Sequence, residues 1–307
     1  MLAIDMRSLE IASKALQESP SIANGEDEFG TIPLFKAVEN GYVPMLKLLL
    51  KYGANPKETS NSDTLLHAHC YSNNPNPDLL RFLIQQCGLE VNAVGQNGDT
   101  ALHCAAISHH LPLVRTLLEL GADPKKINNE NETALHHAAK CILMNEKTME
   151  IAKLLIRAGT PLYQQSNFSG TILHLASLEN HVKLAQLLVK KAPDLLNIES
   201  TGSLCRTKLP LDIAKIQYNI EMISVLCVRH HQMKAADKPH ESFPKLLFSF
   251  GIRKNKITGP KVAVALEKIA EKKSKKIAIE TANRFIKWNH SHNRHFNLKE
   301  IKKLGLS

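Results

Sequence analysis

Several features that mark membrane proteins and common enzyme classes are missing from this chain of 307 residues. No apolar run approaches the ~18 residues that a transmembrane helix needs, so the sequence predicts no membrane-spanning helix. Residues 1–7 do not combine a basic segment with an apolar core, so we expect no secretory signal. No Gly-rich phosphate loop and no His-Glu-x-x-His motif occurs, which leaves two frequent catalytic signatures unrepresented.

Paired cysteines are also missing, because none of the six cysteines forms the Cys-x-x-Cys spacing that is frequent in zinc and redox sites. The six are Cys70, Cys87, Cys104, Cys141, Cys205 and Cys227. Most fall at positions that the repeat described below assigns to helix interiors. Buried, reduced thiols are typical of reducing compartments, so we expect a cytoplasmic or nuclear protein.

The positive charge of the chain is concentrated at one end. The net charge is +10, and residues 235–307 alone carry +11, whereas the first 234 residues carry −1. The hydrophobic content of 43% is normal for a folded protein. The shift in composition near Ala235–Pro239 predicts a domain boundary, with a basic helical region at 235–307.

A short motif recurs along the preceding part of the chain. Thr100-Ala101-Leu102-His103 reappears, with small changes, at 64–67, 133–136 and 171–174, and weaker copies lie at 33–35 and 210–212. Its leucine column is Leu34, Leu66, Leu102, Leu135, Leu173 and Leu211. The steps between these leucines are 32, 36, 33, 38 and 38 residues. A Thr before an apolar turn predicts a helix start, and Gly121 predicts the end of the following helix.

This motif and its period resemble the ankyrin repeat. About six copies cover roughly residues 26–230, and the boundaries of the repeat region are placed at 26–234. The resemblance implies an all-α solenoid of helix pairs with projecting finger loops, and a concave face that binds a protein partner. It implies no catalysis and no cofactor, and we expect a monomer. The irregular repeats and the Lys, Asn, Ile and His content are also similar to ankyrin-repeat effectors that intracellular bacteria deliver into host cells.

The repeats depart from the family pattern at identifiable positions. Phe35 and Asp212 replace the histidine of the motif, and residues 73–77 are predicted to form an inserted loop. His109 and Asn180 stand where a turn glycine is usual. Residues 142–144 lengthen another turn, as a partner contact or folded back on the helices. Residues 8–18 predict a helix within an N-terminal cap, 1–25, since solenoid ends need covering.

The motif histidines allow a metal-site hypothesis that their geometry disfavours. Packed helices lie about 8–10 Å apart, whereas zinc needs every ligand atom within about 2.3 Å of one ion. Stacked histidines therefore cannot converge on a single ion. Resemblance to the ankyrin family implies a structural role instead, in which His67, His103, His136 and His174 bind neighbouring backbone. A cysteine nucleophile has no oriented base in the pattern, so we assign no catalytic, cofactor or metal residue.

Partner contacts are expected at the finger loops, because the repeat framework does not dictate their residues. The proposed contact residues are Asn61, Ser62, Gln96, Asn97, Asp99, Asn129, Asn131, Glu132 and Phe168. We therefore expect the protein to act as an interaction scaffold or adaptor.

The basic tail has several interpretations that the sequence leaves open. Its basic patch comprises Arg253, Lys254, Lys256, Lys272, Lys273, Lys275 and Lys276. This patch is a solvated helix face, an import signal or nucleic-acid site, or a segment that binds an anionic membrane surface. A further alternative is a C-terminal catalytic module for which the repeats select the substrate.

Overall fold

The computed structural model describes residues 1–28, 30–141, 144–217, 219 and 221–226. Contacts divide the chain into two compact units, Met1–Pro161 and Leu162–Ser307, which are described separately. The predicted boundary at 234/235 and the whole basic patch lie outside the described residues. Within the part that is described, no helix has the length and apolar character needed to span a bilayer.

The first unit opens with a cap of short helices, α1 (Leu2–Asp5), α2 (Leu9–Glu18) and the 3₁₀ helix η1 (Pro20–Asn24). The Oγ atom of Ser8 accepts the Ile11 N–H at 3.4 Å, which caps the start of α2. Ala12 and Leu16 are buried, and α2 packs against α4. The helix predicted over residues 8–18 is confirmed, and it covers the first helix pair.

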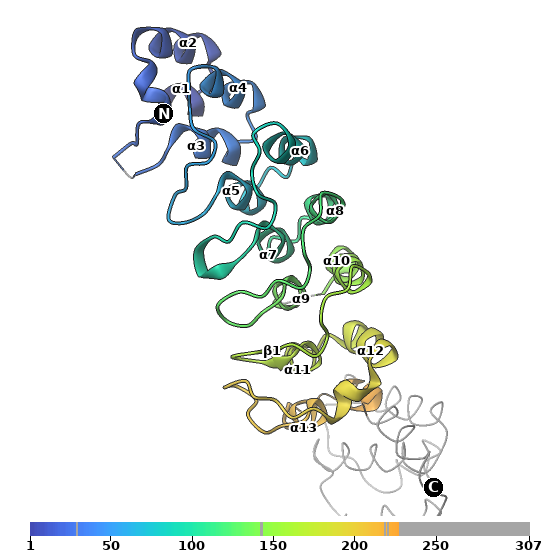
Figure 1. The fold of residues 1–307 in the computed structure, drawn as a ribbon. Helices are drawn as coiled ribbons and strands as arrows, with labels where there is room; N and C mark the ends of the chain where they lie inside the picture. The colour runs from blue at the N-terminus through green and yellow to red at the C-terminus, as the bar shows by residue number, and fades with distance from the viewer. Residues whose placement is uncertain (29, 142–143, 218, 220, 227–307) are drawn as a thin grey trace, which may run out of the picture. The chain divides into compact units, whose positions relative to one another are not determined.

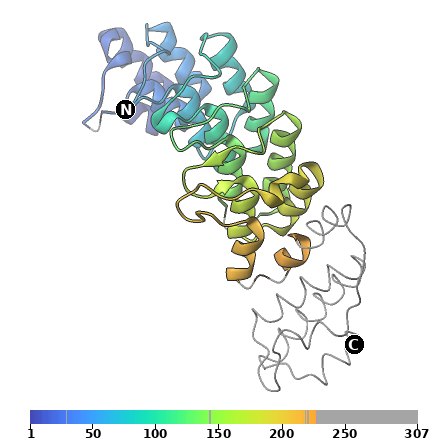
Figure 2. The ribbon, with the colours of Figure 1, turned by 60° about the horizontal axis from the view of Figure 1, so that its bottom comes forward.

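Four helix pairs follow in the first unit, stacked in chain order (Figures 1 and 2). They are α3 (Pro33–Glu39) with α4 (Val43–Lys51), α5 (Leu65–Tyr71) with α6 (Pro77–Gln85), α7 (Ala101–Ile107) with α8 (Leu111–Glu119), and α9 (Ala134–Ala139) with α10 (Glu146–Arg157). The inner helices α3, α5, α7 and α9 contact one another in sequence, as do the outer helices α6, α8 and α10. Each helix contacts mainly its nearest neighbours, which is how stacked repeats bury apolar stripes that no single pair would cover.

The repeated sequence features have the predicted structural roles. The motif leucines of this unit, Leu34, Leu66, Leu102 and Leu135, are at most 1% exposed. The inner helices α5, α7 and α9 begin at the residue after the motif threonine. Gly121 has a φ of +90°, a backbone region that side chains with a Cβ rarely adopt, and it follows the end of α8.

The finger loops connect each outer helix to the next inner helix, and we define them as residues 52–64, 86–100 and 120–133. The middle loop contains the 3₁₀ helix η2 (Gln96–Gly98), and an isolated bridge pairs Val94 with Thr100 at its base. The backbone N–H of Asn129 donates to the carbonyl of Asn97 at 2.9 Å. Consecutive finger loops are therefore joined to each other as well as to their own helices.

The second unit contains α11 (Ile172–Leu178), α12 (Val182–Lys191), the 3₁₀ helix η3 (Pro193–Asn197) and α13 (Pro210–Ile216), with helical residues again at 221–226. Two-residue strands β1 (Gln165–Ser166) and β2 (Gly170–Thr171) pair antiparallel before α11. Helix α11 packs against α12 and α13, and η3 packs against α12. The described residues are thus all-α apart from short strand pairings, as the sequence predicts.

Asparagine side chains also link successive parts of the first unit through hydrogen bonds to backbone groups. Asn92 donates through Nδ2 to the Gly121 carbonyl at 3.3 Å and accepts the Asp123 N–H on Oδ1 at 2.8 Å. Asn24 makes the equivalent bonds to Gly53 and Asn55, at 3.0 and 2.8 Å. One carboxamide therefore satisfies a donor and an acceptor of the backbone that follows the next outer helix.

Replacing Asn92 by Ala is expected to lower the free energy of unfolding by about 1 kcal/mol, because both hydrogen bonds at this half-buried position are lost. Urea denaturation followed by circular dichroism measures the change. The control is Gln86→Ala, which removes an exposed side chain at the end of α6. Equal stabilities for the two variants would contradict the proposed role of Asn92.

Candidate functional site

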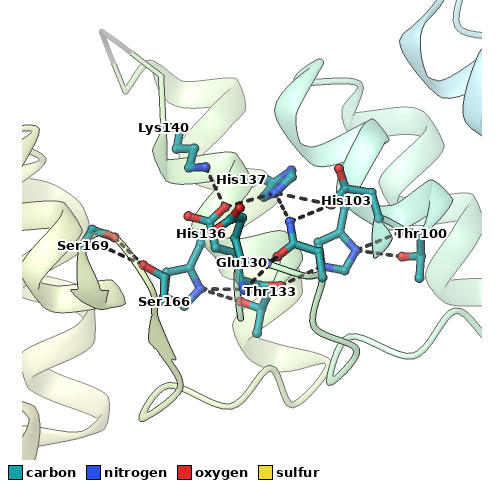
Figure 3. A network of polar contacts seen from close by, with 12 residues as sticks. Thr100, His103, Glu130, Thr133, His136, His137, Lys140, Ser166 and Ser169 are labelled. Carbon is teal, nitrogen blue, oxygen red and sulfur yellow. Dashed lines mark hydrogen bonds and ion pairs between the residues drawn. The ribbon is translucent and has the colours of Figure 1, made fainter. Parts of the chain in front are cut away.

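His67, His103 and His174 are each bound at both ring nitrogens, and Nδ1 of His136 accepts the Thr133 N–H at 3.3 Å. The backbone N–H of Thr100 donates to Nδ1 of His103 at 3.2 Å, and Nε2 of His103 lies 3.0 Å from the carbonyl of Glu132 (Figure 3). Because a carbonyl only accepts, Nε2 carries the proton and Nδ1 is the acceptor, so the ring is neutral. His67 makes the same bonds to Thr64 and Asp99, at 3.1 and 3.0 Å.

The same arrangement recurs in the second unit, where Nε2 of His174 lies 3.0 Å from the Lys208 carbonyl. The predicted structural role is therefore confirmed for His67 and His103, which bind the finger loop of the next repeat, and for His174, which binds the segment that precedes α13. The Thr hydroxyl was expected to cap the helix N–H groups. It does so at Thr64, where Oγ1 accepts the Leu66 N–H at 3.2 Å.

Burial keeps these imidazoles uncharged. Burial, with a smaller contribution from neighbouring His137, lowers the pKa of His103 to about 4. Burial also lowers the pKa of His174 to about 4, and it lowers that of His67 despite the nearby Asp63 carboxylate. Within the described residues, no group of three His, Cys, Asp or Glu side chains is arranged to hold a metal ion. These histidines act as hydrogen-bonding links between repeats.

Two of the expected contact residues belong to a buried polar network. Glu132 is fully buried and lies 2.6 Å from Lys140 Nζ and 3.3 Å from His137 Nε2. Burial alone raises the pKa of Glu132, but hydrogen bonds and charge from His137 and Lys140 lower it to about 2. Asp99 is 6% exposed and accepts a hydrogen bond from Asn128 Nδ2 at 2.9 Å. Figure 3 shows His137 between the His103 ring and Lys140.

This burial corrects the expectation that Asp99 and Glu132 are exposed contact residues. Each directly precedes a motif threonine, where the chain turns from the finger loop into the inner helix. Their side chains therefore lie between repeats and are excluded from the docking surface proposed below. The other expected contact residues are exposed: Asn61, Ser62, Gln96, Asn97, Asn129, Asn131 and Phe168. Asn61, Asn97 and Asn131 have φ angles of +51°, +59° and +56°, in the left-handed region that asparagine tolerates.

A pocket of about 530 Å³ lies on the face formed by inner helices and finger loops of the first unit. We call it the inner-face pocket. Helix α3 contributes Phe35 and Glu39, Asn40 follows the end of α3, and α5 contributes Ala68 and Tyr71. The finger residues Ser60, Asn61, Asp63 and Gln96 form its second side, and Ser72, Asn73 and Asn74, from the loop after α5, form its third.

The local sequence explains why the pocket is there. Asn61 and Ser62 both have positive φ, and Ser60 bridges to Asp63, which makes a tight turn at the finger tip. Oδ1 of Asp63 accepts the Gln96 N–H at 2.8 Å, so two finger loops are held together beside the pocket. The insertion predicted at 73–77 forms the loop between α5 and α6 as far as Asn76, whereas Pro77 is the first residue of α6. The finger loops and this insertion therefore leave the space between them.

Tyr71 is the aromatic side chain that the pocket exposes, with 48% of its surface accessible. Burial, assisted by the neighbouring Cys104 thiol, raises the pKa of Tyr71, so its phenol stays neutral. Of the lining residues, the sequence predicts Asn61 and Gln96 as contact residues but does not indicate Glu39, Asp63 or Tyr71. The inserted loop is the sequence feature that indicates this region. Residues 142 and 143, the hydrophobic part of the lengthened turn, lie outside the described residues.

Several known proteins are similar to part of this chain. A family model of ankyrin repeats in three copies matches residues 1–93 and again 66–159, and a single ankyrin repeat matches 170–200. Human transient receptor potential cation channel subfamily A member 1 is 24% identical over 200 residues, covering 62% of this chain and 17% of the channel subunit.

Two viral proteins are also similar. Putative ankyrin repeat protein L371 of Acanthamoeba polyphaga mimivirus is 26% identical over 236 residues, or 75% of this chain and 29% of the relative. Putative ankyrin repeat protein FPV014 of Fowlpox virus is 31% identical over 175 residues, or 57% of this chain and 38% of the relative. The chain thus spans at most 38% of the length of these three relatives.

Repeats of this type generally mediate protein–protein interactions, and the proteins built from them are generally not catalytic. The family models cover more than half of the chain, and helices α3 to α12 and the histidines His67, His103 and His174 lie within the matched residues. This chain therefore belongs to the ankyrin-repeat family.

Proposed function

We propose that the chain is a protein-interaction module that docks a partner on the inner face of residues 1–161. This face consists of the exposed side of α3, α5, α7 and α9 together with the finger loops defined above. Binding requires shape and hydrogen-bond complementarity only, so the proposal involves no cofactor and no bond-making step.

In the finger loops, one set of groups links the repeats and another set stays exposed, and this separation supports the proposal. The links between repeats use backbone groups and buried side chains, such as the carbonyl of Asp99 bonded to His67. The tip side chains Gln96 and Asn97 remain exposed. Exposed polar and amide side chains on a rigid framework are suited to partner recognition. Because the backbone that carries them is already ordered, it loses little further conformational entropy on binding.

Adding charge at the finger tips is expected to weaken partner capture by about tenfold or more, because desolvated unpaired charge opposes docking. The variant combines Gln96→Lys with Asn97→Asp and Asn131→Asp. Asp is chosen at positions 97 and 131 because it tolerates their left-handed backbone. Captured proteins are compared by quantitative pull-down with the full wild-type chain.

The matched control for this experiment is Arg115→Glu, which changes the charge of an exposed residue on the outer helix α8. Capture that survives the tip substitutions, in variants with unchanged circular dichroism, would contradict the proposed face. Loss of the same partners with Arg115→Glu would move the docking surface to the outer helices.

Two finer expectations stay predictions. One is an effector role inside a host cell, and the other is binding of nucleic acid or an anionic membrane by residues 235–307. The net charge of +11 in that segment supports the second, because clustered Lys and Arg bind phosphates with a strong dependence on salt.

A further inference from the structure

The charged side chains that line the inner-face pocket are all acidic. Its lining includes two carboxylates, Glu39 and Asp63, and no Lys, Arg or His. Glu39 is exposed and forms no ion pair with any residue in the described part of the chain. Asp63 uses Oδ1 to accept the Gln96 N–H, and no described side chain neutralises its charge by an ion pair.

Two cations close to Glu39 in the sequence or the fold bind groups other than the pocket carboxylates. Lys36, one turn before Glu39 on α3, pairs with Asp5 at 3.3 Å. Arg7 donates to the carbonyl of Asn40 at 3.2 Å, and its guanidinium lies 5.8 Å from the centre of the Tyr42 ring. Behind the finger loop, buried His67 is neutral because its ring is hydrogen-bonded at both nitrogens. The two pocket carboxylates therefore have no ion-pair partner among the described residues.

The remaining lining groups suit a long cationic side chain and the peptide around it. Tyr71 offers an exposed ring on which an ammonium or guanidinium group can stack. The carboxamides of Asn61, Asn73 and Asn74 supply both donors and acceptors, which a peptide backbone requires. A volume of about 530 Å³ lies within the usual range of ligand pockets, about 300–1,000 Å³.

We propose that the inner-face pocket binds a Lys or Arg side chain from an extended segment of the partner protein. The cation lies between the carboxylates of Glu39 and Asp63 and against the ring of Tyr71, and the asparagine carboxamides bind the flanking peptide backbone. This inference rests on the proposed function and adds the chemistry of the residue that anchors the partner.

The test uses random dodecapeptides displayed on phage and selected against the full chain. Selected peptides are expected to share a Lys or Arg. Replacing that residue by norleucine, or introducing Glu39→Gln with Asp63→Asn into the chain, is expected to raise the dissociation constant about tenfold or more. Asn at position 63 keeps an oxygen that can accept the Gln96 N–H. Glu18→Gln, which neutralises an exposed carboxylate at the end of α2 and outside the proposed docking face, is expected to leave binding unchanged.

Several outcomes would overturn the inference. Peptides that respond to the finger-tip variant but lack a cation, or that bind equally to Glu39→Gln/Asp63→Asn, would overturn the pocket assignment and leave the proposed docking face intact. Failure to select any peptide would overturn it as well, while the pull-down still tests the docking face. Carbodiimide cross-linking of Glu39 or Asp63 to a lysine in 235–307 would identify the chain's own tail as the occupant and overturn the assignment to a partner.

Discussion

Acidification from pH 7 to pH 4 is expected to lower the free energy of unfolding by about 3 kcal/mol through His103 alone. The unfolded imidazole titrates near pH 6.5, whereas the folded one titrates near pH 4. Between these pH values the imidazole is protonated in the unfolded chain but not in the folded one. The contribution of His103 to stability is therefore complete above pH 6.5 and declines as the pH falls towards 4. Protonation also places a new N–H on Nδ1, directly against the Thr100 N–H that now donates to it.

The measurement is urea denaturation of the full chain at a series of pH values, for the wild type and for His103→Gln. Glutamine retains a side-chain amide donor but does not titrate, so the loss of stability between pH 7 and pH 4 should be about 3 kcal/mol smaller in this variant. Gln86→Ala serves as the control and should keep the wild-type dependence. Parallel curves for wild type and His103→Gln would contradict the assigned pKa and its cause.

Gly202→Ala is expected to destabilise the second unit by about 3 kcal/mol. A Cβ at this position would lie 2.4 Å from both the Gly170 nitrogen and the Phe168 carbonyl oxygen. Both atoms belong to the backbone, so relief requires two loops to separate. The N–H groups of Ser203 and Leu204 donate to the carbonyls of Asn167 and Phe168, each at 2.9 Å, and these bonds should break first.

Hydrogen exchange measures this effect locally, as faster exchange at the amides of Ser203 and Leu204. Gly25→Ala is the matched control, because the nearest atom to its Cβ would be 3.6 Å away, which is an ordinary contact. Its stability should remain within about 0.5 kcal/mol of the wild type. Unchanged exchange at Ser203 and Leu204 in Gly202→Ala would show that the two loops separate without cost.

The fold was predictable because the same short sequence signals recur from repeat to repeat. Thr100 predicts the start of an inner helix, Leu102 predicts its buried face and Gly121 predicts the end of the outer helix, and all three predictions are confirmed. The asparagine links were not predicted, because Asn92 looks like any loop asparagine until the backbone of the next repeat lies beside it.

The candidate site was less predictable, for a physical reason. Exposure at a finger tip depends on which way one residue turns, and Asp99 lies only two residues from exposed Asn97. The inner-face pocket joins Glu39, Tyr71 and Gln96, which lie on different repeats. Periodicity places each residue within its repeat, but it does not indicate which irregular residues of successive repeats meet.

The histidine links have a consequence for how such a chain can change over time. His67 and His103 bind the carbonyl oxygens of Asp99 and Glu132, and every amino acid supplies a carbonyl. The connection between repeats is thus indifferent to most side chains in the loop it secures. Diversification of recognition can proceed at positions such as Gln96 with little risk to the architecture, and a randomised library at those positions would retain its scaffold.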